Sequence, residues 1–225
     1  MTDKSWKTAY RSFYYEHAPI PQDLDLDPAE TALLVIDVQN AYLVEASDPL
    51  ERERWAPFMQ RMHGLVIPNI QRLIKHCRDK SMNVMFARIA CQTPDGRDRS
   101  LSQRKPGFNN LLLPKGEDTS QIIDELAPRP EEIVVLKTTD SALTGTNLRL
   151  MLNNVGIRHV ICVGIFTDQC VSSTVRSLAD ESFDVLVCHD ACAAATDTLH
   201  ENELTTINWI YCQVASTEET LGFIG

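Results

Sequence analysis

Short, continuous runs of apolar and β-branched residues recur along the chain and alternate with helical patterns. The runs span 31–36, 83–89, 133–136, 159–163, 184–188 and, more weakly, 212–215. Because these runs are continuously apolar, both faces of each strand should be covered, which is typical of parallel sheets. Helical patterns lie between them, near 59–80, 119–126, 146–154, 171–181 and 198–211. This order predicts an α/β fold, a three-layer α/β/α sandwich around a mainly parallel sheet of about six strands.

The composition indicates one water-soluble domain and argues against nucleic acid as a partner. The chain has 225 residues, and 44% of them are hydrophobic, which is enough to bury a sizeable core. No apolar run approaches the roughly 18 residues of a membrane span. The first 21 residues hold no apolar block with a small-residue cleavage site, so we expect no secretory signal and a cytoplasmic location. A formal charge of −10 without a basic stripe argues against nucleic-acid binding.

Two segments lie outside the alternating pattern. Residues 1–29 are predicted to be an N-terminal arm, and residues 30–225 the domain itself. The arm contains Trp6 and four more aromatic residues, which suits packing on a surface, either this chain's or a neighbouring subunit's. Segment 91–115 is polar, rich in Pro, Gly and Arg, and long enough to be a functional loop that forms one wall of a pocket. We expect both segments to influence substrate choice.

The chain has seven cysteines, one of which is placed for catalysis. The odd number, and the position of several inside apolar runs (Cys162 and Cys188 among them), indicate reduced thiols that pack as small hydrophobes. There is no Cys-x-x-Cys pair and no His and Cys cluster at zinc-site spacing, so no structural zinc is predicted. Cys170, by contrast, sits in a strand-to-helix turn. There the helix dipole and free backbone N–H groups should lower the thiol pKa and supply donors for an oxyanion.

Polar residues follow three of the predicted strands. Asp37 ends the first run, Lys137 ends the run at 133–136, and Cys170 follows the run at 159–163. Because the carboxyl ends of parallel strands share one edge of the sheet, we expect these three side chains to converge. A carboxylate can accept the thiol proton, and an ammonium group stabilises both the thiolate and the carboxylate. The predicted reaction is attack of the sulfur on a carbonyl carbon and hydrolysis of the resulting thioester.

At these residues the chain resembles the isochorismatase-like cysteine hydrolases, which include N-carbamoylsarcosine amidohydrolase, nicotinamidases, biuret and triuret hydrolases and ureidoacrylate amidohydrolase. The resemblance covers about residues 30–222 and rests on LLVIDVQN at 33–40, KTTDSALTGTNL at 137–148 and GIFTDQCV at 164–171. It implies a Rossmann-like fold and a catalytic triad of Asp37, Lys137 and Cys170. It also implies a cis peptide between Ile165 and Phe166, with the N–H groups of Phe166 and Cys170 forming the oxyanion hole.

The prediction is therefore a metal-independent cysteine amidohydrolase without a cofactor, acting on a small, polar amide, ureide or carbamoyl compound. Metal-dependent nicotinamidases carry an Asp-x-His and a further His after the catalytic Asp, whereas residues 40–55 here contain no histidine. Two rivals stay open: a hydrolase of the isochorismatase type that cleaves a vinyl ether without a covalent intermediate, and a non-catalytic interaction protein that has kept the fold. The resemblance and the aromatic arm suggest a homo-oligomer, either a dimer or a tetramer.

Several other residues receive narrower predictions. Gln39, Tyr42 and Phe166 are the predicted substrate-binding residues, with Gln39 equally suited to orienting the neighbouring Asp37 or to starting a turn. His200 is expected at the surface or in a helix cap rather than against the substrate. Arg176 is expected to make a structural ion pair.

Overall fold

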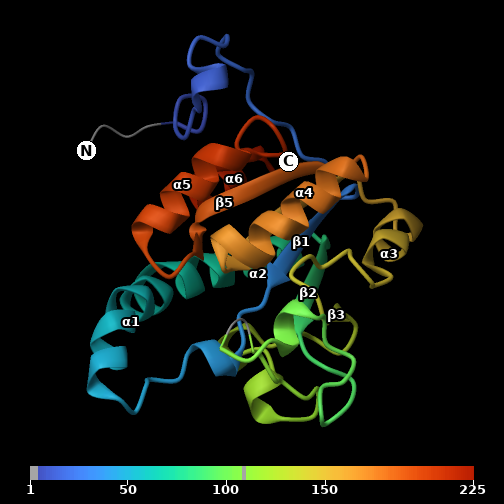
Figure 1. Ribbon diagram of the computed structural model, residues 1–225. Helices are drawn as coiled ribbons and strands as arrows, with labels where there is room; N and C mark the ends of the chain where they lie inside the picture. The colour runs from blue at the N-terminus through green and yellow to red at the C-terminus, as the bar shows by residue number, and fades with distance from the viewer. Residues whose placement is uncertain (1–4, 108–109) are drawn as a thin grey trace.

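Six parallel strands form one sheet in the computed structural model, which describes residues 5–107 and 110–225 (Figure 1). The strands are β1 (Thr31–Ile36), β2 (Asn83–Ile89), β3 (Ile133–Lys137), β4 (His159–Ile165), β5 (Asp184–Ala193) and β6 (Gln213–Ala215). Their order across the sheet is β3-β2-β1-β4-β5-β6, and every neighbouring pair is parallel. The predicted parallel α/β fold is confirmed.

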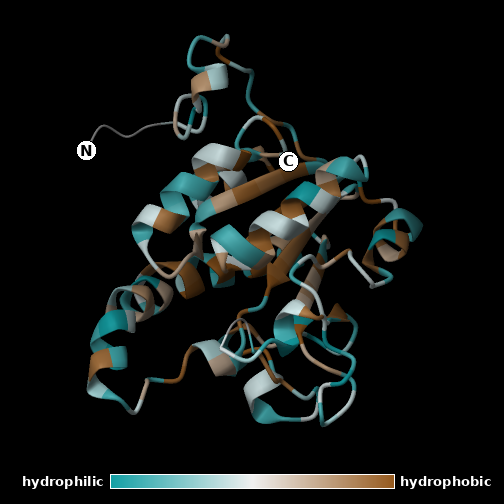
Figure 2. Cartoon of the chain, in the orientation of Figure 1, coloured by the Kyte–Doolittle hydropathy of each residue, from teal (hydrophilic) through white to brown (hydrophobic). Residues whose placement is uncertain are grey.

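Helices cover both faces of this sheet. They are α1 (Pro49–Arg61), α2 (Ile67–Asp79), α3 (Leu148–Asn154), α4 (Ser172–Asp180), α5 (Asp197–Ile207) and α6 (Thr217–Phe223). One apolar cluster joins α2 and α6 to the β1 face that carries Leu33 and Val35, and a second joins α3, α4 and α5 to the face that carries Leu34 and Ile36. Figure 2 shows the result, with hydrophobic strands between helices whose outer sides are hydrophilic. None of the helices in the described part of the chain is long and apolar enough to cross a bilayer.

The helix predicted at 59–80 begins earlier and is interrupted. The α1 helix starts at Pro49, after Asp48, whose carboxylate accepts the N–H of Leu50 at 2.8 Å. An Asp N-cap followed by Pro at the first helical position is a start signal that the weak apolar periodicity of this segment concealed. A π-helical turn, Met62–Val66, then connects α1 to α2.

The helix predicted at 119–126 is wrong, because only two 3-10 turns form there, Asp118–Ser120 and Asp124–Leu126. Between these two turns, the backbone of residues 121–122 pairs with the loop after β1 and does not form helical hydrogen bonds. The carbonyl of Gln121 accepts the N–H of Asn40 at 3.0 Å, and Ile122 forms an antiparallel bridge with Gln39. Tertiary pairing has therefore replaced a short helix of marginal propensity.

The N-terminal arm packs on this chain's own surface, beside α6 and the C-terminus (Figure 1). Trp6 is buried, and its ring meets that of Phe223 edge-on at 5.7 Å. The side chain of Asn208 donates to the carbonyls of Ala9 and Tyr10 at 3.2 and 3.1 Å. Burial of Trp6 attaches the segment to the domain, since it hides apolar surface that a free tail would expose, whereas Phe13 and Tyr14 stay exposed.

The β1 and β4 strands approach closely at their carboxyl ends, where Ile36 pairs with Gly164. Gly164 has a φ of +117°, a conformation that residues with a Cβ rarely adopt. A Cβ at this position would overlap the carbonyl oxygen of Ile36 and lie 2.9 Å from its backbone nitrogen and carbonyl carbon. This close approach fixes the residues that follow each strand relative to one another.

We expect Gly164→Ala to destabilise the fold by about 3 kcal/mol or more, because it combines a disfavoured φ with a backbone overlap that cannot relax easily. Gly64→Ala is the matched control, since Gly64 lies in an exposed helical turn with nothing within 4 Å of the added methyl. That change should be neutral or stabilising by up to about 1 kcal/mol. Urea unfolding followed by circular dichroism measures both, and equal stabilities would contradict the close approach.

Candidate active site

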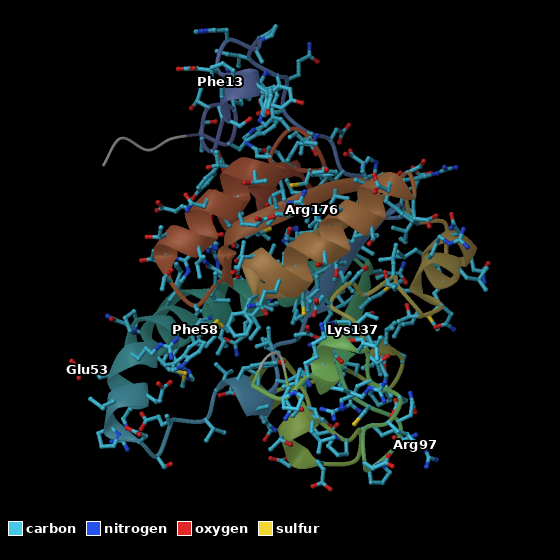
Figure 3. All side chains as sticks on the ribbon, viewed as in Figure 1. Phe13, Glu53, Phe58, Arg97, Lys137 and Arg176 are labelled. Carbon is cyan, nitrogen blue, oxygen red and sulfur yellow. The ribbon has the colours of Figure 1, made fainter. Side chains whose placement is uncertain are left out.

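The strand order places β1 and β4 side by side at the centre of the sheet, where strand order reverses. Ligands of open α/β sheets bind beyond the carboxyl ends of the strands at such a point. Asp37 directly follows β1, and Cys170 lies in a π-helical turn, Thr167–Val171, between β4 and α4. Lys137 is the last residue of β3 (Figure 3). Three separate strands thus deliver these side chains to one edge.

A long side chain is needed for Lys137 to reach Asp37, because β2 separates their strands and neighbouring strands lie about 4.8 Å apart. The lysine stem crosses this gap and is fully buried, with Nζ 2.7 Å from Asp37 Oδ2 and 3.3 Å from Cys170 Sγ. The ammonium also donates to the Thr139 carbonyl at 3.1 Å. The three residues predicted to converge do lie together, with the Lys137 ammonium paired with Asp37 and donating to Thr139 and Cys170.

Burial and charge act against each other at these three groups. Burial raises the pKa of Asp37, and Lys137 opposes that rise without cancelling it. Burial alone would lower the pKa of Lys137, but Asp37 and Cys170 together raise it, so the lysine stays an ammonium. Burial and the negative charge of Asp37 raise the pKa of Cys170 well above its usual value, although Lys137 acts in the other direction.

The expectation of a lowered thiol pKa is therefore wrong for this structure. That expectation rested on the helix end alone, whereas Cys170 is only 6% exposed and lies next to a carboxylate. A neutral thiol needs a base at the moment of attack. The raised pKa of Asp37 makes it a stronger base for that proton than an exposed aspartate would be.

A cavity of about 120 Å³ opens in front of the sulfur. It is lined by Asp37, Tyr42, Ile89, Leu111, Asp140, Ile165, Phe166, Gln169 and Cys170. Leu111 belongs to segment 91–115, so the prediction that this segment forms a pocket wall is confirmed. This volume is well below the roughly 300–1,000 Å³ of sites that hold drug-sized ligands, so the cavity suits a compact group such as an amide or carbamoyl group.

Asp140 is a lining residue that the sequence reasoning missed. Its carboxylate oxygen Oδ1 lies 3.9 Å from Cys170 Sγ, within the range of a weak S–H hydrogen bond. Asp140 lies inside the motif that starts at Lys137. It was missed because the prediction used only the first polar residue after each strand. A second carboxylate therefore faces the reacting sulfur.

Phe166 and Tyr42, two of the predicted substrate-binding residues, both line this cavity. Their rings meet edge-on at 5.4 Å between centroids. The peptide between Ile165 and Phe166 is cis, as the family resemblance implied. Burial and then the charge of Asp37 raise the pKa of Tyr42, which keeps its hydroxyl protonated.

Gln39 has a different place from the one predicted. Its side chain is buried and turned toward backbone, donating to the carbonyls of Ile89 and Ser120 at 2.9 and 2.8 Å and accepting the N–H of Ile89 at 2.9 Å. Gln39 does not line the cavity at Cys170. It ties the turn beside Asp37 to the end of β2, which supports the orienting role and not the substrate-binding one.

His200 was expected at the surface or in a cap, and this too is corrected. The imidazole is buried, with Nδ1 2.8 Å from the Thr167 hydroxyl and Nε2 2.9 Å from Arg61 Nη2. Burial, followed by Arg61, lowers the pKa of His200 to about 3, so the ring is neutral. The predicted ion pair of Arg176 is confirmed, with Glu203 at 2.7 Å.

Among residues 5–107 and 110–225, no group of three or more His, Cys, Asp or Glu side chains is arranged to hold a metal ion. A thiol and two carboxyl groups line the cavity, and the ammonium of Lys137 contacts the thiol and one of the carboxyl groups. A second cavity adjoins this one at Tyr42 and Phe166 and is described below. The described arm residues line neither of the two cavities, so the expectation that the arm shapes the pocket finds no support within this chain.

Comparison with known proteins places the chain in a family. A family model described as the isochorismatase domain matches residues 31–219. Ureidoacrylate amidohydrolases of Pseudomonas savastanoi pv. phaseolicola and Methylobacterium radiotolerans are 30% and 31% identical to it, over 88% and 90% of this chain and 85% and 83% of theirs. A cysteine hydrolase from Pseudomonas syringae pv. phaseolicola has the same fold, with a TM-score of 0.77 at 21% identity over 92% of this chain and 97% of that one. The chain belongs to the isochorismatase family of hydrolases.

Proposed function

We propose that the protein is a metal-independent cysteine amidohydrolase that cleaves a C–N bond of a small amide, ureide or carbamoyl compound through a thioester. The contact of Lys137 Nζ with both Cys170 Sγ and the Asp37 carboxylate, at a small cavity that Cys170 and Asp37 line, is the observation that carries the proposal. The similarity to ureidoacrylate amidohydrolases supports amide hydrolysis as the reaction class.

The first half of the reaction begins with a neutral thiol. Asp37 accepts the thiol proton as the sulfur attacks the carbonyl carbon, and the C=O electron pair moves onto oxygen. The backbone N–H groups of Phe166 and Cys170 are the proposed donors to that oxyanion. The intermediate then collapses, the C–N bond breaks, and Asp37 returns the proton to the leaving nitrogen. Ammonia or an amine leaves, and the acyl group remains on sulfur.

The second half consumes one water molecule. Asp37, again ionised, takes a proton from water as the hydroxyl oxygen attacks the thioester carbon. The C–S bond breaks, the proton passes to sulfur, and the acid is released with the thiol restored. Lys137 stabilises negative charge on whichever of Asp37 and Cys170 carries it, because its ammonium contacts both.

The charges in the cavity favour a substrate rich in N–H groups. Two carboxyl groups, those of Asp37 and Asp140, line the cavity, and Lys137 pairs with the first of them. A substrate carboxylate beside the scissile bond would be repelled, whereas an amide or ureide nitrogen can donate to Asp140. Asp140 is therefore the proposed acceptor for the leaving nitrogen's N–H.

Cys170→Ala should lower amide turnover by at least about 10⁴-fold, because the nucleophile is lost. Ammonia release from acetamide and uncharged urea derivatives measures this. Cys77→Ala, which removes a buried thiol in α2, is the matched control and should keep normal turnover. Full ammonia release by Cys170→Ala would refute the thioester mechanism.

Lys137→Met should reduce turnover by at least about 100-fold and destabilise the fold by about 3 kcal/mol, since it leaves a buried carboxylate without its counter-charge. The double variant Asp37→Asn/Lys137→Met removes both charges and should recover most of that stability while staying inactive. Urea unfolding and ammonia release separate the two effects. Near-normal turnover of Lys137→Met would remove the lysine from the mechanism.

Asp140→Asn should shift alkylation of Cys170 by iodoacetamide to lower pH. The Asp140 charge helps to raise the pKa of the thiol, so neutralising it favours the thiolate and lowers that pKa. Mass spectrometry of the Cys170 peptide across a pH series measures the shift. Asp25→Asn changes the net charge equally from the exposed arm and should leave the profile in place; a matching shift there would refute a local effect.

A further inference from the structure

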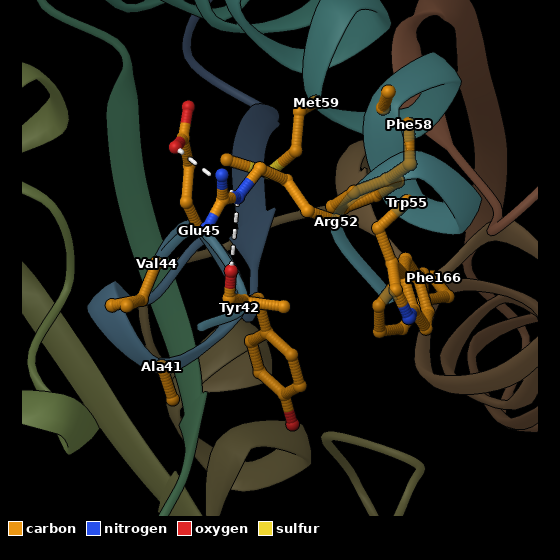
Figure 4. A pocket seen from close by; sticks show the side chains of 11 residues that line it. Ala41, Tyr42, Val44, Glu45, Arg52, Trp55, Phe58, Met59 and Phe166 are labelled. Atoms are coloured by element: carbon orange, nitrogen blue, oxygen red, sulfur yellow. Dashed lines mark hydrogen bonds and ion pairs between the residues drawn. The ribbon is translucent and has the colours of Figure 1, made fainter. Parts of the chain in front are cut away.

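The cavity at Cys170 is called the reaction cavity below. A second, larger cavity of about 480 Å³ lies beside it (Figure 4). Its volume falls within the range of small-molecule binding sites in proteins, roughly 300–1,000 Å³. One wall comes from α1, with Trp55, Phe58 and Met59, and the opposite wall from the segment after β1, with Ala41 and Val44. Most of these side chains are apolar, so the cavity is suited to an apolar group.

The two cavities share Tyr42 and Phe166. These two rings are in contact, so the boundary between the cavities is a single pair of side chains. Beyond the boundary, Phe166 packs on Phe58 at 5.3 Å and lies 6.3 Å from Trp55 between ring centroids. An apolar surface therefore runs without a break from the neighbourhood of Cys170 to α1.

Two charged residues, Arg52 and Glu45, are among those that line this larger cavity, and both side chains are exposed. Arg52 and Glu45 pair there at 3.9 Å, so neither offers an uncompensated charge. The Arg52 guanidinium is further held by the carbonyls of Ala46 and Ser47, at 3.1 and 3.4 Å. The paired Arg52 and Glu45 therefore favour neither an acidic nor a basic group on the ligand, and the cavity selects its ligand by apolar contact.

We propose that the larger cavity binds an apolar alkyl or aryl chain of the substrate, while the reaction cavity binds its amide or carbamoyl group. The inference rests on the proposed amidohydrolase function and narrows its substrate class. The reaction cavity has about a quarter of the volume of the larger one, so it suits the reacting group and little else. A substrate such as hexanamide fills both cavities by parting the rings of Tyr42 and Phe166, whereas a wholly polar ureide leaves the larger one without a partner.

A homologous series of straight-chain primary amides, from acetamide to hexanamide, tests the inference. Each added methylene should raise kcat/KM about fourfold, which corresponds to about 0.8 kcal/mol of apolar burial. Acetamide and hexanamide should then differ by about 250-fold. A flat or falling series, measured by ammonia release, would overturn the inference.

Two variants locate the effect. Ala56→Trp fills the cavity from α1, and Val44→Trp fills it from the opposite wall; each should bring the hexanamide-to-acetamide ratio of kcat/KM close to one. Glu53→Trp is the matched control on the outer side of α1 (Figure 3) and should keep the ratio of the unaltered protein. Circular dichroism verifies that each variant is folded. An unchanged ratio in both filling variants would refute the assignment of the chain to this cavity.

Binding separates this inference from the proposed function. Calorimetry with Cys170→Ala, which cannot turn over, should detect hexanamide but not acetamide, and adding Ala56→Trp should abolish the hexanamide signal. Absence of hexanamide binding would overturn the inference even if acetamide is hydrolysed. Hexanamide binding without ammonia release from any amide by the unaltered protein would instead refute the proposed function and leave the cavity assignment standing.

Discussion

Asp37 and Lys137 face each other 2.7 Å apart, with both side chains almost fully excluded from water. Desolvating two charges costs several kcal/mol, and an apolar pair of similar size would often be as stable. The fold supports the pair by bringing the ends of β1 and β3 to one edge, and by giving the ammonium two further acceptors at Thr139 and Cys170. We infer that the pair is retained for its chemistry and not for stability.

In the proposed mechanism, the ion pair also accounts for the use of a thiol with a raised pKa as the nucleophile. Moving the proton from sulfur to Asp37 transfers a negative charge between two groups that already contact the same ammonium. The total charge of the cavity does not change, so Lys137 stays paired before and after the transfer. Little reorganisation is required, which is the condition under which buried electrostatic interactions assist a reaction. A low resting pKa is then unnecessary.

Continuous apolar runs were enough to predict the strands and the parallel sheet, and strand ends were enough to bring Asp37, Lys137 and Cys170 together. These predictions succeed because strand burial and sheet geometry depend on local pattern. The remaining errors concern tertiary contacts. The role of Gln39 depends on Ser120, 81 positions away, and the burial of His200 depends on Arg61, 139 positions away. No local pattern encodes such pairs.

The proposed reacting groups and the proposed chain-binding cavity come from different parts of the fold. The reacting groups stand at or just after the strands, whose positions the sheet fixes, whereas the proposed chain-binding cavity is built from α1 and the segment after β1. In α1, Phe58 belongs to the buried core and Trp55 and Met59 pack against it, whereas Ala56 and Val44 are exposed lining residues that can change without disturbing the ion pair. The Tyr42 and Phe166 rings are where the two parts meet, since they line both cavities.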